Sequence, residues 1–182
     1  MNWSTRTCSM LLMAILLAAC GGNKIKSDLG IKGAPDWVNE GTQAINNEDG
    51  RLIHGVGMAP TMGDDSLQKA TAENRARAEI ARVLSTYVNA TLNDYTTTLG
   101  YEADASIERN IESQTQLALS GARIIGNWRD KRTGNIYAAA ELDLKTLKQS
   151  LATANNLNAS FKAYFERSAD ANFDRFMGEA AQ

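Results

Sequence analysis

The sequence predicts an α+β fold: a small antiparallel sheet of about three strands, packed by one long helix and followed by an extra C-terminal helix. Three observations lead to this prediction. Apolar residues alternate in three short segments, a helical apolar period runs through the long stretch after the first of them, and a turn sequence joins the last two. Because strands and helices do not alternate regularly, this order favours α+β over a parallel sheet.

The first predicted strand, residues 51–60, reads "RLIHGVGMAP" and has two different faces. One face carries Ile53, Gly55 and Gly57. Glycines make a strand surface flat, so we expect a helix or another backbone to approach this face closely. The opposite face carries Leu52, His54, Val56 and Met58.

The long helix is predicted over residues 66–95. Ser66 is the expected N-cap, and Asp64 and Asp65 place negative charge beside the positive end of the helix dipole. Apolar residues recur at steps of three and four, which predicts a buried stripe. This stripe consists of Ala72, Ala76, Ile80, Val83, Leu84, Tyr87, Val88, Leu92 and Tyr95.

A second helix is expected over residues 107–119, followed by a β-hairpin. The first hairpin strand alternates along residues 122–129, with Ala122, Ile124, Gly126 and Trp128 on one face. Residues 131–135, "KRTGN", supply a turn in which Gly134 can adopt positive φ. The partner strand is "IYAAAELDL", residues 136–144. We expect the aromatic residues Trp37, Trp128, Tyr87 and Tyr95 to pack in the core.

The N-terminal stretch "LLMAILLAACGG", residues 11–22, is apolar but shorter than the roughly 20 residues that a membrane-spanning helix needs. It has the layout of a secretory signal. Its end, Leu17-Ala18-Ala19-Cys20, resembles the bacterial lipobox, in which the cysteine receives diacylglycerol before cleavage. We therefore expect Cys20 to be the lipidated N-terminus of the mature chain, which anchors it to a membrane.

The expected domain organisation follows from this processing site. It comprises a lipoprotein signal peptide (1–19), a flexible tether (20–34), an α+β domain (35–150) and a C-terminal helical extension (151–182). In lipoproteins of the kind this sequence resembles, an aspartate after the cysteine commonly retains the protein in the inner membrane. Here that position is Gly21, so we expect sorting to the outer membrane, with the domain on its periplasmic face or at the cell surface.

Composition excludes several kinds of function. The formal net charge is −2 and no basic block is present, so we expect no nucleic-acid partner. Cys8 lies in the leader and lipid would occupy Cys20, which leaves the mature chain no free thiol or disulfide. Gly55-x-Gly57 lacks the third glycine of a dinucleotide fingerprint. His54 is the single histidine, and we expect it to be structural.

No combination of residues typical of an active site is present, so we expect no enzymatic activity, no cofactor and no metal site. The pair Asp64-Asp65 resembles an acid/base pair, but its place before the helix favours a capping role.

The motifs "PDWV", "GVGMA", "ATAENRARAEIARVL" and "WRDKRTGNIYAAAELDL", in this order and spacing, resemble the LPP20 family of bacterial lipoproteins. The resemblance covers roughly residues 35–147. It implies an outer-membrane lipoprotein with a dodecin-like α/β domain and no enzymatic motif. Related domains occur in accessory proteins of the flagellar basal body, so the resemblance also suggests an association with flagella.

Two classes of function remain. The first, which the tether and amphipathic tail favour, is a non-catalytic structural or assembly component that binds a protein partner or a second copy. The second is a binding module for a small ligand or a cell-wall polymer. In the tail, a stripe of Leu157, Phe161, Phe165, Phe173 and Phe176 either packs wholly on the domain or also presents a surface for a partner.

Overall fold

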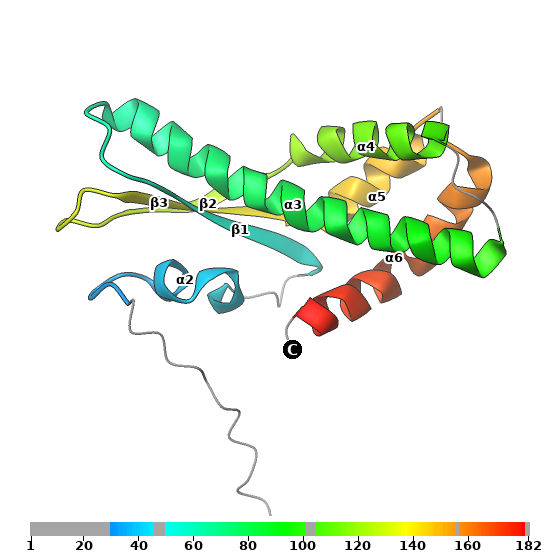
Figure 1. Cartoon of the computed structure of the whole chain (residues 1–182), viewed down its shortest axis with the longest axis horizontal. Helices are drawn as coiled ribbons and strands as arrows, with labels where there is room; N and C mark the ends of the chain where they lie inside the picture. Colours follow the sequence, from blue (N-terminus) through cyan, green and yellow to red (C-terminus); the bar gives the residue numbers. More distant parts are fainter. Residues whose placement is uncertain (1–29, 46–49, 101–104, 156, 181–182) are drawn as a thin grey trace, which may run out of the picture. The chain divides into compact units, whose positions relative to one another are not determined.

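The computed structural model confirms the α+β class and describes residues 30–45, 50–100, 105–155 and 157–180. Figure 1 shows the elements in chain order. They are α2 (Asp36–Asn39), the 3-10 helix η2 (Gly41–Ala44), β1 (Leu52–Ala59), α3 (Asp65–Leu99), α4 (Ala105–Leu119), β2 (Arg123–Arg129), β3 (Ile136–Asp143), α5 (Leu144–Thr153) and α6 (Ala159–Ala180).

The three strands form one antiparallel sheet in the order β1-β3-β2. The predicted hairpin joins β2 to β3 through a turn in which Gly134 has φ of 76°. The Asp130 carboxylate closes this turn by accepting hydrogen bonds from the Thr133 hydroxyl (2.7 Å) and the Arg132 amide (2.8 Å). These bonds lower the pKa of Asp130.

The glycine face of β1 packs directly against α3, as the sequence predicts (Figure 1). A Cβ atom added to Gly55 would lie 2.1 Å from the carbonyl oxygen of Ala76. At Gly57 it would lie 2.4 Å from the carbonyl oxygen of Ala72. Helix and strand backbones therefore approach at a distance that only glycine permits.

Helix α3 begins one residue earlier than expected, and its N-cap is Asp64 rather than Ser66. The Asp64 carboxylate accepts hydrogen bonds from the amides of Ser66 (2.8 Å) and Leu67 (3.0 Å). An aspartate satisfies these two free amides and also interacts favourably with the helix dipole, so Asp64, two residues before Ser66, is the preferred N-cap. The predicted inward stripe is confirmed, with only Val83 half-buried.

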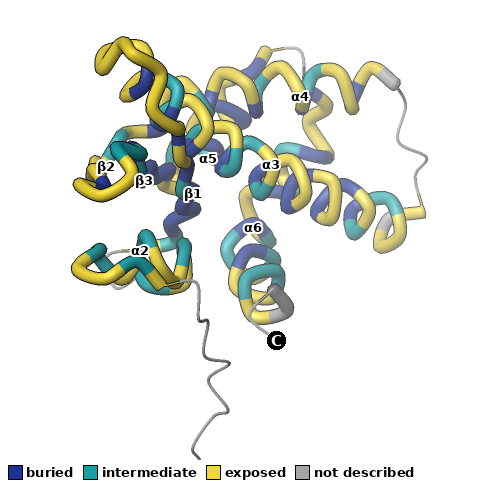
Figure 2. Tube along the Cα trace, turned by 60° about the vertical axis from the view of Figure 1, so that its left-hand side comes forward, coloured by how far each residue is buried: buried dark blue, intermediate teal, exposed yellow. Residues whose placement is uncertain are grey.

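With 35 residues, α3 is roughly 52 Å long at 1.5 Å per residue, whereas an eight-residue strand spans only about 27 Å. Its C-terminal half therefore extends past the sheet. There it packs against α4 and α6, and α5 packs against both of these helices. Figure 2 marks the buried residues of these four helices, which belong to one common core.

The C-terminal segment forms two helices, and α6 buries its apolar stripe against α3. Phe161, Phe165 and Phe173 are at most 3% exposed, and Phe176 is half-buried. The rings of Phe173 and Phe161 make edge contacts with Tyr87 (5.5 Å) and Tyr95 (5.3 Å), respectively. The stripe is therefore used mainly inside its own domain.

The strict alternation predicted for the first hairpin strand is wrong, because β2 contains a bulge between Ile124 and Gly126. Ile124 pairs with Ala140 and shares the face that packs on α3. Gly126 pairs with Ala139 and lies on the opposite face, together with Trp128. One extra residue in a strand reverses the direction of every side chain that follows.

The prediction that all four aromatic residues pack in the core is wrong for Trp37 and Trp128. Tyr87 and Tyr95 are fully buried, whereas both tryptophans are half-buried on the sheet face away from α3. Because α3 covers only one face, the aromatic side chains on the other face remain partly accessible to solvent.

Candidate functional site

The lipidation residue Cys20 and the sorting residue Gly21 lie outside the described residues, as do the signal peptide and most of the tether. The described chain begins at Gly30 and reaches α2 within six residues. Within the part of the chain that the structure describes, no helix is long and apolar enough to cross a membrane. The residues that bear on function in the folded domain lie on the sheet and between the helices.

A row of three charged or polar residues crosses the sheet on the face away from α3. His54 on β1 and Arg123 on β2 both lie opposite Glu141 on the central strand β3. The His54 Nε2 atom lies 3.1 Å from Glu141 Oε2. Arg123 donates from Nε (3.0 Å) and Nη2 (2.6 Å) to Glu141 Oε1. This row connects all three strands through a single carboxylate.

The two ends of this row differ in exposure. The side chains of His54 and Glu141 are only 3% and 10% exposed, whereas that of Arg123 is 75% exposed. Burial alone would raise the pKa of Glu141, but the hydrogen bonds from Arg123 and His54 outweigh burial and hold this pKa below its usual range. Both carboxylate oxygens are thus engaged, which favours a structural role for His54.

Acidification below about pH 4.5 is expected to lower the free energy of unfolding through Glu141, whose ordinary pKa is 4.5. Because folding lowers this pKa, the stabilisation is complete above pH 4.5 and is lost as the pH falls through the folded value. In urea unfolding at a series of pH values, Glu141→Gln should weaken this dependence. The exposed control Glu166→Gln should leave it as in the wild type, and an unchanged dependence in Glu141→Gln would contradict the prediction.

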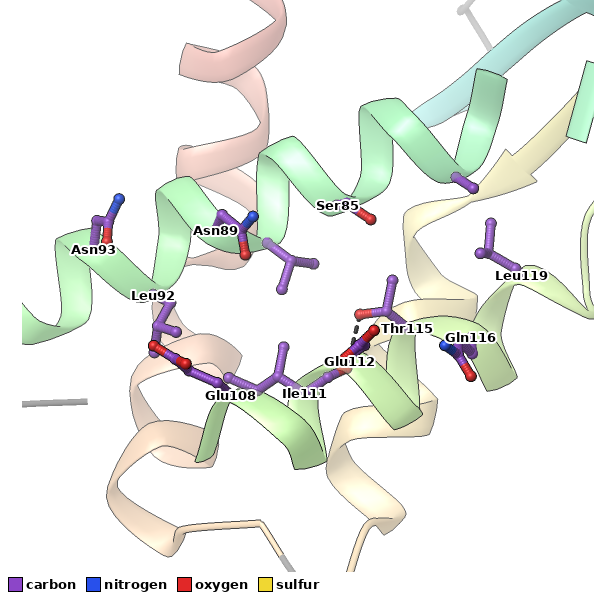
Figure 3. Close-up of a pocket in the computed structure, with 12 residues that line it drawn as sticks. Ser85, Asn89, Leu92, Asn93, Glu108, Ile111, Glu112, Thr115, Gln116 and Leu119 are labelled. Atoms are coloured by element: carbon purple, nitrogen blue, oxygen red, sulfur yellow. Dashed lines mark hydrogen bonds between the residues drawn. The ribbon is translucent and has the colours of Figure 1, made fainter. Parts of the chain in front are cut away.

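A groove of about 730 Å³ lies between α3 and α4. Figure 3 shows polar side chains on both of its sides. Ser85, Asn89 and Asn93 come from α3, and Glu108, Glu112 and Gln116 come from α4. Its base includes the buried residues Val88, Leu92 and Ile111. The groove has the size of a small-ligand site, with polar groups from two helices around an apolar base.

A smaller hollow of about 360 Å³ lies between α5 and α6 and has a basic rim. Lys145, Lys148 and Lys162 surround it. Lys148 donates to the Asp170 carboxylate (2.9 Å), and Lys162 donates to the carbonyl oxygen of Ala152 (3.3 Å). Since two of the three cations already have partners, this hollow is less suited to a ligand than the groove.

The sequence contained a signal for the His54 partner that the prediction missed. Glu141 is the one charged residue inside the apolar segment "IYAAAEL", and a charge in a buried strand requires a partner. The groove had no such signal, because its polar residues are ordinary positions on two separate helices and its apolar base is part of the core. Within the described ranges, no group of three or more histidine, cysteine, aspartate or glutamate residues is arranged to hold a metal ion.

No protein-family model matches the chain, and a search of curated proteins gives no match. Its function therefore has to be argued from its own residues. The features available are the N-terminal processing site, the polar row, the groove and the partly exposed face of the sheet.

Proposed function

We propose that this chain is an outer-membrane lipoprotein, anchored through acylated Cys20, and a non-catalytic structural or assembly component of the cell envelope that binds a protein partner or a second copy. The observation that carries the proposal is the sequence Leu17-Ala18-Ala19-Cys20 directly after a short apolar run. The order of its motifs supports membership of the LPP20 family, and with it an association with the flagellar basal body.

The sheet face away from α3 supports a role in protein interaction. Met58, Tyr137 and Trp128 are aligned across the three strands at the hairpin end. Met58 is 37% exposed, both aromatic residues are half-buried, and their rings are 5.7 Å apart. Apolar residues clustered on a surface mark sites where proteins associate, so we define Met58, Tyr137 and Trp128 as the apolar row.

Replacing Cys20 by alanine is expected to leave an unprocessed precursor without lipid. Two or more acyl chains hold a protein firmly to a membrane, since each buried methylene contributes about 0.8 kcal/mol. Metabolic labelling with a fatty acid and the size of the chain on a gel would show both effects. A Cys8→Ala variant is the control and should be processed normally. Normal cleavage and lipid labelling of Cys20→Ala would contradict the assignment.

Wild-type protein is expected in the outer membrane, because Gly21 occupies the position at which aspartate retains lipoproteins in the inner membrane. Density separation of the two membranes and immunodetection would locate the protein. Gly21→Asp should move it to the inner membrane, whereas Gly22→Asp should not. Recovery of the wild type mainly from the inner membrane would refute the sorting assignment.

Site-specific crosslinking in the native envelope tests the interaction role. A photoreactive residue at Met58 is expected to capture one defined protein, identified by mass spectrometry, or a second copy of this chain. The control is the same group at Leu117, which is 59% exposed on α4 and lies outside the groove and the apolar row. Equal capture of the same proteins from both positions, or none from Met58, would argue against the proposal.

The second candidate, a binding module for a small ligand or cell-wall polymer, is favoured by the groove between α3 and α4. Purified protein in non-ionic detergent should remain on isolated murein if this candidate is correct. Retention should then fall in Asn89→Ala and Glu112→Gln, both at exposed positions in the groove. A defined oligomer in light scattering, with no retention, supports the assembly role instead.

A further inference from the structure

The segment of residues 31–45, here called the strap, contains α2 and η2 and lies across the sheet face away from α3 (Figure 1, Figure 2). The strap has its own internal bonds. The Asn39 side chain accepts from the Ile31 amide (2.7 Å) and donates to the Ile31 carbonyl oxygen (3.2 Å). Further backbone bonds join Ala34 to Ile31, Val38 to Pro35, Glu40 to Asp36 and Ile45 to Thr42. It is therefore a small unit with a defined conformation.

Contacts between the strap and the sheet are apolar. Among the described residues, no hydrogen bond or ion pair joins residues 31–45 to any other element. Neither α2 nor η2 contains a buried residue. The indole of Trp37 lies over Gly126, with its Cζ2 atom 3.6 Å from where a Cβ would be. One half-buried indole on a flat glycine thus provides the clearest contact.

The strap lies on a sheet face that carries buried residues although no long helix covers it. η2 packs against β1, on whose outward face Leu52 and His54 are 7% and 6% exposed. Buried polar groups usually have hydrogen-bond partners, and His54 and Glu141 are partners of each other. Here η2, part of a segment without polar bonds to the sheet, packs on the strand that carries His54, and the partly exposed apolar row lies farther along the same face.

We propose that the strap is displaceable, and that the sheet face beneath it, continuous with the apolar row, binds an acidic protein segment that places an aromatic side chain on Gly126 in place of Trp37. This inference rests on the proposed interaction role. It specifies that the partner segment is acidic and aromatic, and that the partner takes the place of the strap.

The chemistry of the partner follows from the strap and from the adjacent edge strand. In the strap, Trp37 is flanked by exposed Asp36 and followed by exposed Glu40. The edge strand β2 carries Arg123 on this face, and the turn that follows adds Lys131 and Arg132, whereas Arg129 lies on the α3 side and pairs with Asp65 (3.0 Å). Arg123 and Arg132 remain 75% and 80% exposed although each has an acidic neighbour. A segment with the strap's own acidic and aromatic pattern therefore matches this face in charge and shape.

The single histidine of the chain allows strap displacement to be measured. Full-length lipoprotein in non-ionic detergent would be treated with diethylpyrocarbonate, and modification of His54 followed by mass spectrometry. Trp37→Ala should raise the modification rate at least about tenfold, and Trp37→Phe should restore protection. Leu117→Ala, at an exposed position on α4 outside the strap and the apolar row, should leave the rate unchanged. Circular dichroism would confirm that each variant is folded, and equal protection in Trp37→Ala and the wild type would overturn the proposal.

A peptide of residues 31–45 tests the docking surface itself. The labelled peptide should bind the Trp37→Ala chain, and a peptide in which alanine replaces tryptophan should not. Excess peptide should also reduce crosslinking from the photoreactive group at position 58 in isolated envelopes.

The outcomes separate the two proposals. If the group at position 58 captures a partner that the peptide does not displace, the interaction role stands and the strap proposal is wrong. If Met58 captures nothing, the interaction role fails, and His54 protection and peptide binding still decide the strap. If two copies of the chain form a dimer by exchanging their straps, the surface binds a second copy. The proposal of a different protein as the partner would then be wrong.

Discussion

A chain truncated after Ala154 is expected to lose its cooperative thermal unfolding transition. The truncation removes Leu157, Phe161, Phe165 and Phe173, which are at most 6% exposed and pack in the same core cluster as α3. Each fully buried side chain of this kind contributes roughly 1.5–3 kcal/mol. Their combined loss is comparable to the total stability of a domain, which is about 5–15 kcal/mol. Circular dichroism melting would show the effect.

Point variants on α6 separate this loss of packing from a mere shortening of the chain. Phe165→Ala should lower the free energy of unfolding by about 3–5 kcal/mol, the usual cost of removing a buried aromatic ring. Glu166→Ala, at the next and exposed position, should change it by less than about 0.5 kcal/mol. If the truncated chain melts cooperatively near the wild-type temperature but loses an oligomer or a partner, the helix serves interaction rather than the core.

The second large effect is expected at the contact between β1 and α3. Gly55→Ala should lower the free energy of unfolding by more than about 3 kcal/mol, the upper end of the usual cost of added methylene groups in a packed core. The new Cβ would lie 2.1 Å from a backbone oxygen of Ala76, so the helix itself would have to move. Gly57→Ala should behave in the same way, with a contact of 2.4 Å. Denaturant unfolding monitored by circular dichroism measures both.

Gly126→Ala is the matched control for this contact. Gly126 belongs to the same sheet and, like Gly55 and Gly57, does not have positive φ. Its added Cβ would meet only the Trp37 ring, at the ordinary contact distance of 3.6 Å. We therefore expect a change of less than about 1 kcal/mol, because no backbone has to move to admit the added methyl group. Equal losses at Gly126 and Gly55 would show that strand propensity, rather than the approach of the helix, sets the cost.

Local patterns were sufficient to predict the elements whose neighbours in sequence are also their neighbours in space. The stripe of α3 follows from its own helical period, and the hairpin follows from the turn around Gly134. The glycine face of β1 likewise indicated a close helix, which the structure confirms. In contrast, the bulge near Ile125 could not be predicted, because it arises from pairing with β3 and leaves no mark in the alternation of β2.

The candidate sites divide in the same way. The lipidation site depends on a short linear motif ending at Cys20, so the sequence by itself determines that prediction. The His54–Glu141–Arg123 row, the groove between α3 and α4, and the position of Trp37 on Gly126 each join residues far apart in the chain. Only the tertiary structure decided these, because strand register and helix packing depend on long-range burial, which no local period encodes.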